Sequence, residues 1–95
     1  MDIKTLEYME ERAGKARAIV DRIELLLKRV NSVKKSSGVI DLYTPNRTVR
    51  IDPQYREDGH AVNNFETRIA AAIYNTFIDV TLQEIRHLEK ELAEL

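Results

Sequence analysis

The first third of the chain repeats apolar residues at alternating spacings of three and four. The repeat comprises Leu6, Met9, Ala13, Ala16, Val20, Ile23, Leu27 and Val30. This spacing is typical of a coiled-coil seam on an α-helix. Beside its later half, a second row at Ile19, Leu26 and Val33 widens the apolar stripe to three positions per heptad. A stripe of this width suits a helical bundle better than an isolated two-stranded coil.

Both ends of this helix carry recognisable signals. Asp2 is placed to accept hydrogen bonds from the first free backbone N–H groups, as N-cap residues do. Lys34, Lys35 and Gly38 supply the cations and the permissive φ that helix C-termini favour. We therefore predict a helix over residues 3–35.

The next segment, residues 36–59, predicts a β-hairpin and a loop. Ser36, Ser37 and Gly38 interrupt the helix, and prolines at 45 and 53 prevent another. Strands fit at 39–43 and 48–51, around a connection at 44–47. This pairing sets Leu42 opposite Val49, Ile40 opposite Ile51 and Asp41 opposite Arg50. One face is then apolar and the other carries an ion pair. Because proline cannot take the positive φ of two-residue hairpin turns, we expect a longer loop built on a type I or II turn.

A second helix is predicted over residues 60–95, beginning between Asp58 and Asn63. Its apolar line consists of Val62, Phe65, Ile69, Ile73, Phe77, Ile85, Leu88, Leu92 and Leu95. Between residues 70 and 82, apolar groups point in nearly every direction, which indicates burial on several sides. One antiparallel partner helix covers a single side, so we expect a second subunit there. The predicted oligomer core is Ile69, Ile73, Phe77 and Val80.

The predicted fold class is mainly α, in one domain spanning residues 1–95. It is an antiparallel, coiled-coil-like helical hairpin with a short β-hairpin between the helices, assembling into a multi-helix bundle. A chain of 95 residues buries a small share of its surface, and with no cysteine it has no disulfide or thiolate zinc site to stabilise it. We therefore expect a homo-oligomer, either a dimer or a tetramer.

Composition also bears on location and partners. The first residues are charged, and no apolar run approaches the roughly 20 residues of a membrane span, so we expect a soluble, cytoplasmic protein without a membrane partner. Charge is uneven: residues 28–56 hold seven basic and two acidic side chains, whereas residues 57–95 hold three and eight. Such asymmetry indicates either an anionic partner or pairing within and between subunits.

No residue set has the spacing of a catalytic, metal or cofactor site. His60 and His87 are too far apart to meet within one subunit, and Glu84 and Glu91 beside His87 are typical of a solvated helix face. Gly14 lies among alanines, where close helix approach explains the small residues better than a phosphate loop does. We predict a non-catalytic interaction module without cofactor or metal.

One polar cluster suggests a binding site at the hairpin end and the start of the second helix. It contains Tyr43, Arg47, Arg50, Tyr55, Arg56, His60, Asn64 and Arg68. Arginine guanidinium groups bind phosphates, and tyrosine rings stack on bases. Both side chains are also common anchors in protein–protein interfaces. A protein or a phosphate-bearing ligand is expected here, which makes a nucleotide or nucleic-acid binder the alternative function. In the competing interpretation, Arg50 and Arg56 pair with Asp41, Asp52 or Glu57.

The order helix, β-hairpin, helix resembles the β-type subunit of prefoldin, a coiled-coil chaperone. The likeness covers the whole chain as architecture, and it implies a chaperone as a second alternative function. The chain is also similar to small accessory proteins of bacteriophages, which often end in a Leu/Glu-rich helix such as residues 88–95, LEKELAEL.

Overall fold

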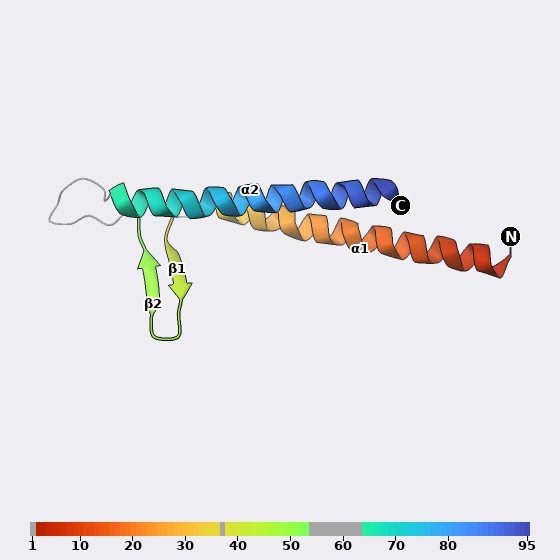
Figure 1. Ribbon diagram of the computed structural model, residues 1–95, viewed down its shortest axis with the longest axis horizontal. Coiled ribbons are helices and arrows are strands. Elements are labelled where there is room, and N and C mark those ends of the chain that lie inside the picture. Colours follow the sequence, from red (N-terminus) through yellow and green to blue (C-terminus); the bar gives the residue numbers. More distant parts are fainter. Residues whose placement is uncertain (1, 37, 54–63) are drawn as a thin grey trace.

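A computed structural model describes residues 2–36, 38–53 and 64–95 (Figure 1). Helix α1 spans Ile3–Lys34, strands β1 and β2 span Ile40–Tyr43 and Thr48–Ile51, and helix α2 spans Asn64–Glu94. The chain is therefore mainly helical, with an antiparallel β-hairpin between two helices that pack on each other. This confirms the predicted helical hairpin.

Helix α1 begins and ends where its capping residues predicted. The Asp2 carboxylate accepts a hydrogen bond from the backbone N–H of Thr5 at 2.7 Å. Lys35 is the C-cap, and its backbone N–H reaches back to the carbonyl of Asn31 at 3.2 Å. Gly38 follows with a φ of +98°, and a Cβ at this position would approach the Pro53 ring to 2.8 Å. Only glycine meets both conditions without strain.

The β-hairpin has the predicted register. Ile40 pairs with Ile51, Asp41 with Arg50, and Leu42 with Val49. The connection is a four-residue loop, closed by the Thr44 N–H donating to the Arg47 carbonyl and the Arg47 N–H donating to Thr44 Oγ1. Thr44 therefore stabilises the loop through its side chain as well as its backbone.

Only the base of the hairpin is packed against the helices. Ile51 is buried where β2 meets α2, whereas Leu42 and Val49 farther out are exposed. In Figure 1 the strands project away from the helix pair. The predicted apolar face of the hairpin is thus buried at one end only.

The core between the helices is small. Leu26, Ile85 and Leu88 are buried together, and Ile19, Ile23 and Leu82 pack around them. Four apolar residues of α1, spaced to follow one helix face, lie on this side and are named here the inner row: Ile19, Ile23, Leu26 and Val30.

The two helices are offset along their length. Ser36, just beyond the end of α1, donates a hydrogen bond to the hydroxyl of Tyr74, a full ten residues into α2. At the opposite end, Leu95 shares a surface hollow with Tyr8 and Arg12. The first turns of α1 extend past the C-terminus of α2 in Figure 1. The radius of gyration is 20.8 Å, compared with about 12 Å for a compact domain of this length.

Two further predictions concern the helices. The predicted start of the second helix, between Asp58 and Asn63, lies outside the described residues, and so does Val62. The close helix approach expected at Gly14 is wrong within this chain: a Cβ added there would meet no described atom within 4 Å. In the described part of the chain, neither helix combines the length and apolar content of a membrane-spanning segment.

Candidate functional site: the unpaired apolar faces and the hairpin end

Helix α1 carries a second apolar stripe, which α2 covers only in part, since Met9, Ala13 and Ala16 line a surface hollow together with Leu92 and Ala93 of α2. It is the earlier part of the heptad repeat together with Leu27, and it is named here the outer row: Leu6, Met9, Ala13, Ala16, Val20 and Leu27. Its large members are all exposed, although Ile23 and Val30 of the same repeat turn towards α2. The predicted seam is therefore split, since only part of it is used within the chain.

Three consecutive leucines show this division residue by residue. Leu26 is 5% exposed because it points into the core with Ile85 and Leu88. Leu25 and Leu27 are 42% and 43% exposed. Successive residues are rotated by about 100° around a helix, so the three side chains point in three directions. Leu27 continues the outer row, while Leu25 belongs to neither row.

Helix α2 shows the same division. Ala70, Ile85 and Leu88 are buried in contact with the rest of the chain. The residues predicted as an oligomer core lie elsewhere: Ile69 and Ile73 are half-buried, Phe77 is 38% exposed and Val80 is 57% exposed. Within one chain these four residues form no buried cluster. Their role in an oligomer stays a prediction.

The exposed area of the whole chain is large for its mass. The surface measures 7770 Å², whereas a compact monomer of 11.0 kDa exposes about 5,600 Å². The difference is roughly 2,000 Å², and a specific interface of standard size buries about 800 Å² on each partner. The excess therefore exceeds what one stable dimer contact would cover.

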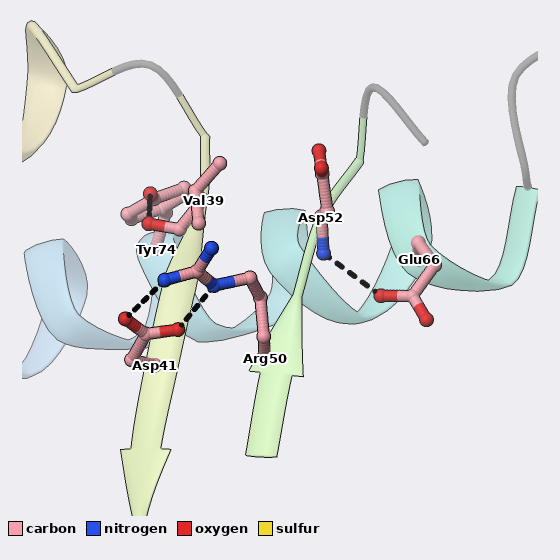
Figure 2. Close-up of polar contacts among 6 residues, drawn as sticks. All are labelled: Val39, Asp41, Arg50, Asp52, Glu66 and Tyr74. Carbon is pink, nitrogen blue, oxygen red and sulfur yellow. Dashed lines mark hydrogen bonds and ion pairs between the residues drawn. The ribbon is translucent and has the colours of Figure 1, made fainter. Parts of the chain in front are cut away.

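Polar contacts attach the β-hairpin to α2 (Figure 2). The Tyr74 hydroxyl accepts from Ser36 Oγ at 2.6 Å and donates to the Val39 carbonyl at 3.3 Å. The Glu66 carboxylate accepts from the Asp52 backbone N–H at 3.0 Å. Tyr74 of α2 therefore binds the segment that leads into β1, and Glu66 of α2 binds the residue that follows β2.

The ion pair across the hairpin is present as predicted. Arg50 donates to both carboxylate oxygens of Asp41, at 2.9 and 3.2 Å (Figure 2). These hydrogen bonds lower the pKa of Asp41 and raise the pKa of Arg50. The bidentate geometry occupies the donors that would recognise a phosphate. For Arg50, pairing within the hairpin is thus the interpretation that the structure favours.

The remaining residues of the predicted binding cluster are divided between described and undescribed parts. Tyr43 is 83% exposed at the end of β1, and Arg47 is exposed in the adjoining loop. Arg68 lies exposed on α2. Tyr55, Arg56 and His60 lie outside the described residues, and Asn64 is described only as the first residue of α2. Among the described members of the cluster, Tyr43, Arg47 and Arg50 lie together on one two-stranded hairpin.

Titratable groups elsewhere in the described residues form no metal-binding cluster of three or more ligands. His87 Nε2 lies 3.8 Å from a carboxylate oxygen of Glu91, one turn further along α2, and both side chains are exposed. Asp2 has a lowered pKa because the Thr5 backbone N–H donates to its carboxylate. Both contacts are local to one helix.

Comparison with known proteins found no matching protein family, no matching curated protein and no matching solved structure. The likeness to prefoldin and to phage accessory proteins therefore stays a resemblance of layout and composition.

Sequence reasoning missed the contacts that join the hairpin to α2. From the sequence alone, Ser36 is a helix breaker and Tyr74 is one residue of a mostly apolar stretch. One signal was available, because a tyrosine within an apolar helix segment usually directs its hydroxyl towards a partner. The partner itself is 38 residues away in sequence and has no local signature.

Proposed function

We propose that this protein is a self-associating helical module whose outer row receives the same helix of a second copy. The observation that carries the proposal is the division of one heptad repeat into a buried and an exposed part. Leu6, Met9, Val20 and Leu27 keep coiled-coil spacing, and all four are exposed in the described part of the chain. Exposed apolar stripes of this kind mark protein interfaces.

The surface area and the shape support the same proposal. An excess of roughly 2,000 Å² over a compact monomer provides room for one or two interfaces of standard size. The intrachain core contributes few buried side chains, so the isolated hairpin has little hydrophobic stabilisation to offset its conformational entropy. Burying a second stripe would supply the missing apolar contact. In this proposal the chain acts by binding and assembly and performs no catalysis of its own.

The leucine triplet provides the test. Sedimentation equilibrium across a range of protein concentrations measures the association of wild type, Leu27→Ser and Leu25→Ser. We expect wild type and Leu25→Ser to associate alike, and Leu27→Ser to dissociate at concentrations where they remain oligomeric. The two variants change equally exposed leucines on the same helix, so a general loss of helix propensity would affect both. A folded wild-type monomer at micromolar concentration would overturn the proposal.

A second candidate function, binding of a phosphate-bearing ligand, is favoured by one observation. Tyr43 at the end of β1 and Arg47 in the adjoining loop are both exposed, so a ring and a guanidinium are available to a ligand at the same end of the hairpin. Fluorescence anisotropy with a labelled single-stranded oligonucleotide tests it. Binding that weakens with added salt and is lost in Arg47→Ala supports this function. Absence of binding at low salt contradicts it.

A further inference from the structure

We infer that the exposed apolar residues of α2 form a second self-association surface, which together with the outer row stacks copies of the chain into an open-ended array. The surface is named here the α2 patch and comprises Ile69, Ile73, Phe77 and Val80. This inference rests on the proposed self-association of the outer row and adds a second contact to it. Its basis is that the two surfaces lie on opposite faces of the helix pair.

Two hollows near the C-terminus of α2 identify the two faces. Glu91 lines one hollow together with Ala18 of α1, whereas Ala93 lines the other together with Ala13 and Ala16. Residues two apart on a helix point about 200° away from each other, so Glu91 and Ala93 lie on opposite sides of α2. The same separation applies to Ala16 and Ala18 on α1. Since Ala13 and Ala16 belong to the outer row, the outer row lies on the face opposite Glu91.

The α2 patch lies on the face of Glu91. Ile73 precedes Glu91 by about five turns of the helix and Val80 precedes it by about three, so these side chains point the same way. Ile69 and Phe77 extend the stripe by about one turn on either side of Ile73. Phe77 and Val80 are 38% and 57% exposed, and Ile69 and Ile73 are half-buried. The patch therefore keeps apolar surface that the described part of the chain leaves uncovered.

The composition of the patch favours a second copy as its partner. The segment from Ile69 to Val80 contains one charged side chain, Asp79. Asp79 directly precedes Val80, so it points about 100° away from it. An anionic partner such as a nucleic acid would meet no cation in this segment, whereas the same patch of a second copy presents aliphatic and aromatic groups. A contact with twofold symmetry joins two identical surfaces in this way.

The exposed area provides for two contacts. The excess over a compact monomer is roughly 2,000 Å², and a contact of standard size covers about 800 Å² on each chain. Pairing through the outer row would leave more than half of this excess exposed. The α2 patch spans about three turns of its helix, compared with about six for the outer row. Its contact is therefore the weaker one and forms at higher protein concentration.

Two contacts on opposite faces do not close into a small oligomer. Pairing of the outer rows joins one face of each chain and leaves both α2 patches on the outside of the dimer. These patches point away from each other, so each can join a further dimer. Repetition of the two contacts then adds copies along one direction without a limit set by symmetry. A closed tetramer would instead require the two surfaces to be roughly perpendicular.

Val80→Ser tests the second contact. Valine and serine have similar helix propensities, so the substitution removes apolar surface with little effect on the helix. Sedimentation equilibrium measures the weight-average mass as protein concentration rises. We expect the mass of wild type to rise past that of four chains without a plateau, and the mass of Val80→Ser to reach a plateau at two chains. Asn75→Ser changes an exposed residue of α2 outside the patch, so this matched control should follow wild type.

The outcomes distinguish the two contacts. A wild type whose mass levels at two or four chains would overturn the stacking and leave the outer row as the contact. Growth of Val80→Ser like that of wild type, or a plateau of Asn75→Ser at two chains, would also overturn the role of the α2 patch. Leu27→Ser should be monomeric at low concentrations at which Val80→Ser is a dimer, because the two substitutions affect different contacts. A wild type that stays monomeric would overturn the proposed function itself.

Discussion

The inner and outer rows of α1 are alike in composition and opposite in environment. Leu26 and Val30 are among the most buried residues of the described chain, whereas Val20 and Leu27 on the same helix are exposed. Both rows have helical spacing, and both consist of aliphatic side chains. The difference arises because α2 packs on one side of α1, and the inner row lies on that side. An apolar stripe thus predicts that a helix will be packed without specifying what packs against it.

The largest effect expected at every protein concentration is at the centre of the inner row. Leu26→Ala removes a side chain that contacts Ile85 and Leu88, and it should reduce the free energy of unfolding by about 2–5 kcal/mol. Urea denaturation followed by circular dichroism measures this change. The effect should persist at protein concentrations low enough to dissociate any oligomer. A loss below about 1 kcal/mol would mean that the helix pair does not depend on this core.

The outer face of α2 offers a second comparison. Phe77→Ala should have an effect that depends on protein concentration, because the ring is 38% exposed in the single chain and would be buried further only by a partner. If the Phe77 ring is part of an oligomer core, the substitution should reduce the free energy of unfolding of the assembled protein by about 3–5 kcal/mol. Thermal unfolding at dilute and at high concentration distinguishes the cases. A small loss, equal at both concentrations, would assign Phe77 to the solvent-exposed surface.

A smaller effect, of opposite sign, is expected at Gly14. No described side chain lies near it, so Gly14→Ala should improve helix propensity and raise the free energy of unfolding by about 1 kcal/mol. Chemical denaturation of the two proteins measures the gain. Because Gly14 is not part of the outer row, association should be unchanged. A destabilised or dissociated variant would show that a second copy approaches α1 at this position.

The smallest effect concerns acid. The lowered pKa of Asp2 means that its contribution to stability is present above the ordinary aspartate pKa and is lost as pH falls through the lowered value. Asn caps a helix without titrating, so Asp2→Asn should lose less thermal stability than wild type between pH 5 and pH 2, as followed by circular dichroism. Asp41→Asn is the parallel case, because the pKa of Asp41 is lowered by Arg50. Identical acid profiles for wild type and Asp2→Asn would contradict the capping role.

Local signals in the sequence determined the elements of this protein. Asp2 begins α1, the alternation of residues 40–43 and 48–51 sets the hairpin register, and the spacing from Leu6 to Val30 predicts a long helix. Each depends on residues that are close in sequence or that pair across a tight connection. Periodicity and capping report such short-range geometry directly.

Tertiary structure alone decided how these elements are arranged. The side of α1 on which α2 packs assigns Leu26 to the core and Leu27 to the surface. The offset of the helices sets Tyr74 beside Ser36 and Val39. It also shows that Arg50 is held by Asp41 while Tyr43 stands free of the helices. Two adjacent apolar rows on one helix satisfy the same sequence pattern equally well. The choice between them depends on the side of α1 against which a distant helix packs, because burial is a property of the neighbours that reach a side chain and not of the side chain alone.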